Sequence, residues 1–194
     1  MNHLAHFKVA YPDPGLLVGS FLGDFVKGRL KGEFPIHVER GIRLHRSVDA
    51  YVDSHPTAQN SARRFASDFR RYGPIMVDVI YDHFLAEHWQ TWHHESIDDF
   101  CETVFSVLAA HRDLLPSSAR KTADRMMASR SLAKYHHAGF VAGSFEHISQ
   151  RLTRNNPLAN GYEQFARNRE ELRNDFNCFF PELLNFTKRW QQEN

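Results

Sequence analysis

Residues 41–55 read GIRLHRSVDAYVDSH, and they place His45, Asp49 and Asp53 at strict four-residue intervals. Side chains four residues apart lie on the same face of an α-helix. A solvent-facing stripe usually mixes Glu, Lys and Arg, whereas a core stripe carries Leu, Ile and Val. A stripe of one histidine and two carboxylates instead indicates either metal ligands or a hydrogen-bond network.

Helical periodicity continues along the rest of the chain, and no segment alternates β-branched residues as a strand would. Gly28 and Pro56 follow two of the expected helices, as glycine and proline commonly do. The pattern predicts an all-α protein with a single helical domain over residues 1–194. We expect helices over residues 2–10, 16–27, 36–53, 58–72, 74–92, 96–115, 117–128 and 138–151, and one or two more after NNPLANG, broken near Pro181.

Composition narrows the class of protein. The chain has 194 residues, of which 42% are hydrophobic, and a net charge of only +1, so no global field favours nucleic acid. No run approaches the roughly 20 apolar residues of a membrane span, and the N-terminus does not resemble a signal peptide. Cys101 and Cys178 lie too far apart for a zinc ribbon and do not suggest a disulfide framework. We therefore expect a cytoplasmic protein; its oligomeric state is left open.

A second group of polar residues lies in residues 77–89, VDVIYDHFLAEHW. Asp78 and Asp82 share a helix face beside an apolar stripe, and His83 projects about 100° away from Asp82. Asp24 lies among apolar residues in the same way. A buried carboxylate needs a partner or a cation. Aspartate with neutral histidine suits Mg, Mn, Fe or Zn, and a site rich in carboxylates favours Mn or Mg.

Each of these features also has an ordinary structural interpretation. Asp24 could cap a helix, His45 and Asp49 could form an ion pair, and Asp82 with His83 could serve packing alone. Missing motifs exclude other classes: no Glu-x-x-His of a di-iron bundle, no His-Glu-x-x-His of a zinc protease, no Gly-x-Ser-x-Gly elbow and no phosphate-binding glycine loop occurs.

Four segments in this order, MNHLAHFKVA, GSFLGDFVKG, GIRLHRSVDAYVDSHP and YDHFLAEHW, resemble the acyl carrier protein phosphodiesterase family, and FFPEL near the C-terminus is also similar to it. The resemblance implies an all-helical, distorted relative of the HD-type metal phosphohydrolases. It implies a metal-dependent phosphoric diester hydrolase that uses Mn²⁺, with Mg²⁺ or another divalent metal possible. The substrate would be holo-acyl carrier protein, whose 4′-phosphopantetheine is released from a serine.

The ordinary HD ligand set does not transfer, because this chain has Asp82-His83 and no His-Asp dipeptide. Chemistry and motif position instead suggest four metal ligands: Asp24, His45, Asp82 and His83. Asp49 and Asp78 are expected to be a further ligand, a general base or residues that orient the ligands. His55 would protonate the leaving serine oxygen, and Asp53 would be structural, paired with an arginine or with backbone N–H groups.

Basic residues after Asp24 suggest how an anionic substrate is held. Lys27 and Arg46 would contact phosphate oxygens, while Arg29 and Lys31, with Lys27, would dock the acidic carrier protein. A second basic run, residues 63–71, is the alternative docking patch. Two other functions stay open: an HD-like phosphohydrolase acting on a nucleotide, and a non-catalytic helical binding protein.

Overall fold

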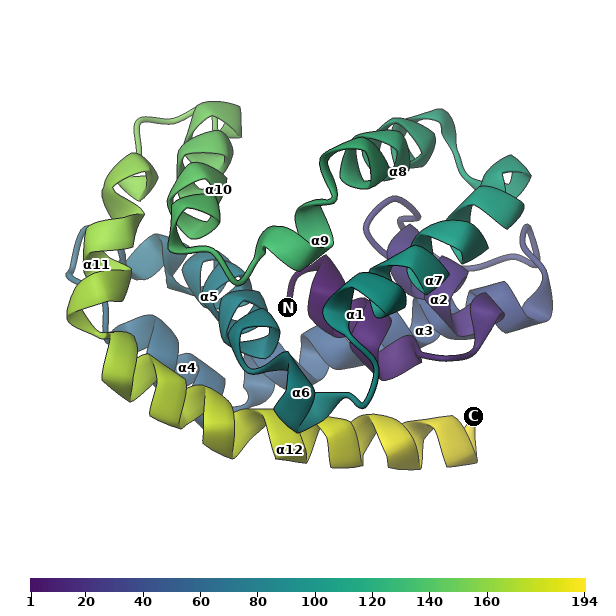
Figure 1. Ribbon diagram of the computed structural model, residues 1–194, viewed down its shortest axis with the longest axis horizontal. Helices are drawn as coiled ribbons and strands as arrows, with labels where there is room; N and C mark the ends of the chain where they lie inside the picture. The colour runs from purple at the N-terminus through teal and green to yellow at the C-terminus, as the bar shows by residue number, and fades with distance from the viewer.

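Helices account for all the regular structure of the protein, and no strand forms (Figure 1). The computed structural model describes residues 1–194, and the prediction of a single all-α domain is confirmed. The α-helices are α1 (His3–Ala10), α2 (Pro14–Leu22), α3 (Ile36–Ser54), α4 (Pro56–Arg63), α5 (Gly73–Glu87), α6 (Trp89–Trp92), α7 (Ile97–Ala110), α8 (Ser117–Ser129), α9 (Ser131–Lys134), α10 (Ala138–Arg151), α11 (Gly161–Arg167) and α12 (Arg169–Glu193). Three single 3₁₀ turns complete the list: η1 (Arg70–Tyr72), η2 (Arg112–Leu114) and η3 (Leu158–Asn160).

The first helix lies inside the molecule. Six of its eight residues are buried, and its N-cap residue Asn2 accepts the backbone N–H of His3. The Asn2 side chain also donates to the Tyr135 hydroxyl at 2.6 Å, which connects the start of the chain to the end of α9. A short helix of this kind depends on tertiary contacts for its stability. Figure 1 shows the N-terminus near the centre of the molecule, between α1, α5 and α9.

Helices α2 and α3 pack unusually closely because glycines form the contact. A Cβ atom added at Gly19 would lie 2.2 Å from the Val38 carbonyl oxygen, and one added at Gly41 would lie 2.7 Å from the Leu16 oxygen. Gly19 and Gly23 are four residues apart, and both lack the side chain that would otherwise keep α3 at a distance. This contact fixes α3, and therefore His45 and Asp49, relative to α2.

One cluster of 48 buried residues forms the core, and phenylalanines such as Phe84, Phe176 and Phe180 are prominent in it. Helix α12 runs along one edge of the molecule, while α8 and α10 stand apart on the opposite side, with α9 between them (Figure 1). None of the helices combines the length and hydrophobicity needed to cross a bilayer. Cys101 and Cys178 are both free, in agreement with the absence of a disulfide framework.

Several predicted helix boundaries are wrong. Helix α2 ends at Leu22, not Lys27, and residues 23–35 form a loop that contains Gly28 and Gly32 at φ of 78° and 79°. Left-handed backbone of this kind is readily adopted by glycine and stops a helix. Helix α4 ends at residue 63 instead of 72, and the expected helix over residues 74–92 is interrupted at residue 88 to give α5 and α6.

The predicted break near Pro181 does not occur, because α12 continues through it for 25 residues. Proline removes one backbone hydrogen bond and strains the preceding turn. Buried residues on both sides, including Phe176 and Leu183, keep the same face of α12 against the core. Packing along this face therefore outweighs the local loss at Pro181.

Candidate metal centre

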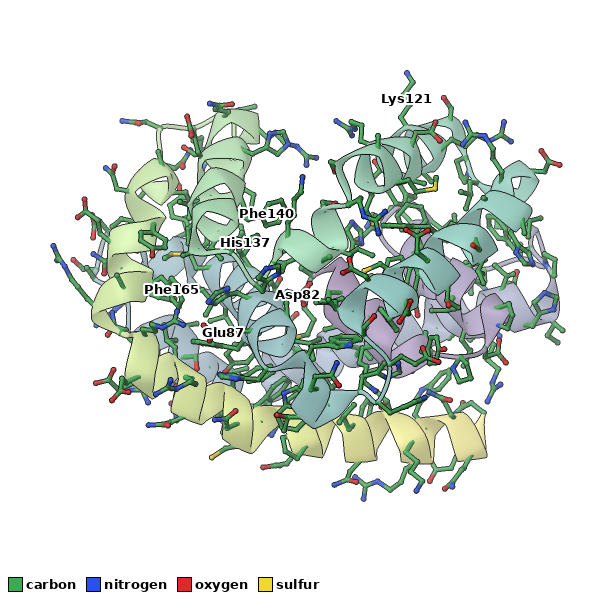
Figure 2. The ribbon with its side chains drawn as sticks, viewed as in Figure 1. Asp82, Glu87, Lys121, His137, Phe140 and Phe165 are labelled. Carbon is green, nitrogen blue, oxygen red and sulfur yellow. The ribbon has the colours of Figure 1, made fainter.

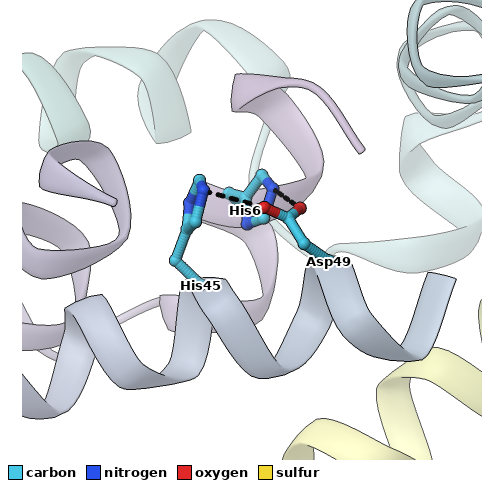
Figure 3. Close-up of side chains that lie close together, drawn as sticks. All are labelled: His6, His45 and Asp49. Atoms are coloured by element: carbon cyan, nitrogen blue, oxygen red, sulfur yellow. Dashed lines mark ion pairs between the residues drawn. The ribbon is translucent and has the colours of Figure 1, made fainter. Parts of the chain in front are cut away.

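Three side chains from two helices converge on one point. His6 comes from α1, and His45 and Asp49 come from neighbouring turns of α3 (Figure 3). Asp49 Oδ1 lies 3.1 Å from His6 Nε2, and Asp49 Oδ2 lies 3.1 Å from His45 Nε2. The two imidazole rings stack with centroids 3.9 Å apart. Each residue offers a ligand atom, and these atoms all lie within 4.8 Å of one another, so the group could hold a metal ion.

Asp24 extends this cluster from the loop after α2. Its Oδ1 lies 3.8 Å from His45 Nε2, and its Oδ2 lies 3.5 Å from His3 Nδ1. Asp24 is the predicted ligand that follows the glycine-rich α2, and the early end of that helix leaves its carboxylate 48% exposed. The structure therefore brings together three predicted site residues, Asp24, His45 and Asp49.

Burial and charge set the protonation of the cluster. Burial lowers the pKa of His6 to about 4, so the ring is neutral near pH 7. Partial burial acts to raise the pKa of Asp49, but the imidazoles of His45 and His6 outweigh it and hold that pKa well below its usual range. Neutral imidazole and ionised carboxylate are the forms that coordinate metals.

Several nitrogen atoms of the cluster have no hydrogen-bond partner. The Nδ1 atoms of His6 and His45 are buried without hydrogen-bond partners, and His6 Nε2 is not aligned for a hydrogen bond despite its closeness to Asp49. Buried polar atoms are normally satisfied, so unpartnered ones need an explanation. Two imidazoles and one or two carboxylates match Mn²⁺, Fe²⁺ or Zn²⁺. Because 45% of the Asp49 side chain is exposed, a cation can reach the cluster from solvent.

Gly23 lets His45 take its position. A Cβ atom at Gly23 would lie 2.2 Å from Cγ of the His45 ring. No real side-chain carbon tolerates such an approach, so any larger residue at this position must displace the ring. Gly19 in α2 therefore serves the packing of the two helices, and Gly23, directly after α2, serves the geometry of the cluster.

Asp82, a predicted metal ligand, binds backbone instead. Its Oδ2 accepts the N–H of Leu4 at 2.8 Å, and its Oδ1 accepts the N–H of Ala5 at 3.3 Å. These are first-turn N–H groups of α1, which have no acceptor within the helix. Asp82 is completely buried, and this burial raises its pKa to about 7. The carboxylate therefore anchors the helix that carries His6.

His83, the fourth predicted ligand, faces away from the cluster. Its Nδ1 lies 2.7 Å from the Tyr135 carbonyl oxygen and must donate to it, and its Nε2 lies 3.1 Å from Nη1 of Arg169. Burial lowers the pKa of His83, in agreement with a neutral ring. Both ring nitrogens have protein partners, so the structure does not bring His83 into the candidate centre.

Three further residues singled out from the sequence, Asp78, His55 and Asp53, do not belong to the cluster of His6, His45 and Asp49. Asp78 Oδ1 is 2.9 Å from the Met1 amine, which is itself 3.9 Å from Asp49 Oδ1. His55 lies beyond the end of α3, where its Nε2 is 3.3 Å from Glu182, and the structure does not bring it to the cluster. Asp53 was expected to pair with an arginine or with backbone N–H groups, but its exposed side chain does neither; the Gln59 side chain instead donates to its backbone oxygen at 2.9 Å.

The basic residues predicted to bind phosphate or the carrier protein differ in their surroundings. Arg46 donates to the Val26 carbonyl oxygen at 2.8 Å and so braces the loop after α2. Lys27, Arg29 and Lys31 lie in that loop, exposed and without an ion pair. Their charges are therefore free to interact with an anionic partner beside Asp24.

Sequence reasoning missed His6 and His3 as members of the cluster. Both histidines stand in the segment MNHLAHFKVA, three residues apart and therefore on one side of α1. The available signal was that spacing, since two histidines near one face of a hydrophobic helix are unusual. It did not reveal which helix they meet.

Comparison with known proteins identifies the family of the chain. The family model described as acyl carrier protein phosphodiesterase matches residues 1–183. The chain is 31% identical over 185 residues to the acyl carrier protein phosphodiesterase of Yersinia pestis, covering 95% of this chain and 96% of that one. It is 32% identical over 189 residues to the enzyme of that name from Serratia proteamaculans, covering 97% and 98%. No solved structure matches significantly, so the relationship to the HD-type fold stays a prediction. The chain belongs to the acyl carrier protein phosphodiesterase family.

Proposed function

We propose that this protein hydrolyses the phosphodiester that joins 4′-phosphopantetheine to a serine of holo-acyl carrier protein, with a divalent cation held by His6, His45 and Asp49. The convergence of these three residues supports the proposal most strongly, because it supplies a metal-binding donor set in a member of a phosphodiesterase family. Mn²⁺ is the cation that the resemblance implies, and the nitrogen and oxygen donors suit it.

The residues around the cluster have distinct roles in this proposal. His6, His45 and Asp49 bind the cation, and Asp24, held by His3, adds a second carboxylate at the exposed side. A bound divalent cation withdraws negative charge from a phosphodiester and makes a neighbouring water more acidic. The neutral ring of His6 and the ionised Asp49 are kept ready for binding by the burial and contacts described above.

In this proposal Asp82 acts indirectly, by positioning the helix that carries the histidines. It holds the first turn of α1 through two backbone N–H groups, and α1 carries both His3 and His6. We therefore assign Asp82 as a positioning residue and not as a ligand. His83 and His55 have no place in this mechanism, because their partners are Tyr135, Arg169 and Glu182.

The test pairs a binding measurement with a product measurement. Wild-type protein with Mn²⁺ should release phosphopantetheine from holo-acyl carrier protein, seen as loss of mass from the carrier. His6→Ala should weaken Mn²⁺ binding by about tenfold or more and abolish the release, since loss of one metal ligand removes more than about 1.4 kcal/mol. His94→Ala, at a histidine with an 81% exposed side chain, is the matched control and should change neither.

Two results would contradict the proposal. The wild-type protein could leave holo-acyl carrier protein intact in the presence of Mn²⁺ while hydrolysing a nucleotide, which would favour the alternative phosphohydrolase. Alternatively, His6→Ala could bind Mn²⁺ as tightly as wild type, which would remove the cluster from consideration as the metal centre.

The exposed cations after Asp24 would dock the carrier protein. Reversing the charge at Arg29 and Lys31 together should raise KM for holo-acyl carrier protein more than it lowers kcat, because rim charges act mainly on encounter. The comparison variant reverses Arg63 and Arg70 on the other basic run. If only that comparison variant raises KM, the docking surface lies along α4 and η1.

A further inference from the structure

A large groove opens between α8 and α10, and its inner end is formed by His3 and Asp24. Its volume is about 1110 Å³. Helices α8 and α10 form opposite walls, joined by α9, and Figure 1 shows these two helices standing apart above the N-terminus. Phe140, labelled in Figure 2, lies on the α10 wall, and Met126 lies on the α8 wall.

The groove is continuous with the candidate metal centre through Asp24. One oxygen of this carboxylate is 3.5 Å from His3, which also lines the groove, and the other is 3.8 Å from the cluster residue His45. A phosphodiester bound at the centre therefore has one substituent that can extend outward along the groove. Pockets for small ligands usually occupy about 300–1,000 Å³, so this space exceeds what a phosphate group alone would need.

The lining suits a slender chain with both polar and apolar parts. Gly139 and Gly143 lie on the α10 wall, and a Cβ atom at either would meet nothing within 4 Å, so the wall is open there. Ser131 and Ser144 offer hydroxyl groups, while Leu132 and the two apolar residues named above offer hydrophobic surface.

Charge in the groove is arranged for an anionic substrate. Arg125 and Arg151 line it and form no ion pair, and the Arg125 guanidinium reaches only Lys121 O at 3.3 Å and Thr122 Oγ1 at 3.5 Å within its own helix. Asp24, at the inner end, is the only carboxylate in the lining. Two unpaired arginines attract a negatively charged molecule toward the carboxylate and the cation it would help to hold.

Resting on the proposed function, we propose that the groove between α8 and α10 binds the pantetheine arm of the substrate, the diamide chain that ends in a thiol or thioester. The phosphate end of the arm would lie at Asp24, with the chain running between Met126 and Phe140. The carrier protein itself would remain outside, over the loop of residues 23–35. This places the two substituents of the scissile phosphodiester on different surfaces of the enzyme.

Gly143→Leu tests the proposal, because it adds bulk to the groove without meeting existing atoms. We expect KM for holo-acyl carrier protein to rise by about tenfold or more, with kcat less affected, since the variant obstructs binding of the arm. Mn²⁺ affinity should match wild type, and thermal stability should be at least as high, because leucine favours a helix more than glycine does. Gln150→Leu is the matched control, because residue 150 is exposed on the same helix but does not line the groove, and it should leave KM unchanged.

Binding of free pantetheine, followed by calorimetry without turnover, separates this proposal from the proposed reaction. Wild type should bind pantetheine and Gly143→Leu should not. If wild type releases no phosphopantetheine from holo-acyl carrier protein but this binding pattern holds, the reaction fails and the groove assignment stands. If wild type is active and Gly143→Leu matches it in KM or in pantetheine binding, the groove assignment is overturned alone. Weaker Mn²⁺ binding in Gly143→Leu would also overturn it, because the effect would then arise at the metal centre.

Discussion

Asp82 connects the stability of the fold to the candidate metal centre. Its carboxylate is fully buried and accepts the N–H groups of Leu4 and Ala5. If it anchors α1, as the geometry indicates, Asp82→Asn should preserve Mn²⁺ binding, because the amide oxygen still accepts one of these N–H groups. If it were a metal ligand, the same change would weaken binding directly.

The pH dependence of stability gives the prediction its magnitude. Burial raises the pKa of Asp82 from 3.8 to about 7 in the folded protein. A carboxyl with a raised folded pKa contributes stability that is fully present below pH 3.8 and is lost as the pH rises through about 7. The gap of about three pH units corresponds to about 4 kcal/mol. Asparagine does not titrate. The unfolding free energy of Asp82→Asn, taken relative to that of wild type, should therefore rise by about 4 kcal/mol between about pH 4 and about pH 7.5.

Urea unfolding, followed by circular dichroism in buffer with a chelator, measures this difference at each pH. A constant difference between wild type and Asp82→Asn across the range would refute the reasoning. Asp82→Ala is the control for the two hydrogen bonds to α1, because it leaves both N–H groups without an acceptor. It should lower the unfolding free energy by about 2–6 kcal/mol near pH 4. Asp82→Asn that folds normally but no longer binds Mn²⁺ would show that Asp82 is a ligand.

Four further substitutions test the packing and electrostatics described above. Gly23→Ala should displace the His45 ring and weaken Mn²⁺ affinity, measured by titration, whereas Gly19→Ala should lower the unfolding free energy by about 1–3 kcal/mol because its Cβ meets the α3 backbone. Burial lowers the pKa of His6 to about 4 in the folded protein, so the stability that this residue contributes above pH 6.5 is lost as the pH falls through 4. Without metal, the unfolding free energy of wild type should therefore fall by about 3 kcal/mol more than that of His6→Gln between about pH 7 and about pH 3.5. Pro181→Ala should raise the unfolding free energy by up to about 3 kcal/mol, because it restores a backbone hydrogen bond within α12, and an unchanged or lower value would mean that the helix needs the bend that proline gives.

The helical architecture and part of the site could be predicted because their signals are local. The four-residue spacing of His45 and Asp49 reports a shared helix face whatever the helix packs against. The spacing of Gly19 and Gly23 likewise reports a face without side chains, and such a face suits close approach of another helix. Boundaries were less predictable, since whether Pro181 ends α12 depends on the apolar contacts made on both sides of it.

His6 could not be predicted because its role depends on a contact between α1 and α3, which sequence spacing does not report. Asp82 and His83 show the opposite error, because both were predicted as metal ligands but have other partners in the structure. Both are buried polar residues that need partners, and the sequence does not distinguish a cation from a backbone N–H group or an arginine. Adjacent positions on a helix project about 100° apart, so two neighbours such as these meet different surroundings. In the structure Asp82 faces α1, whereas His83 faces α9 and α12.

The division of labour among the aspartates follows from how deeply each is buried. Asp82 has no access to solvent, and its two oxygens accept backbone N–H groups, so a cation there would have to displace the start of α1. Asp49 and Asp24 are each about half exposed and contact only imidazoles within the cluster and the Met1 amine. Ligands for an exchangeable cation need that access, whereas an anchor for a buried helix needs its absence. In the proposed function, carboxylates therefore have two roles: the exposed Asp49 and Asp24 would bind the cation, whereas the buried Asp82 anchors α1. The pH experiment on Asp82 measures the second role without involving the first.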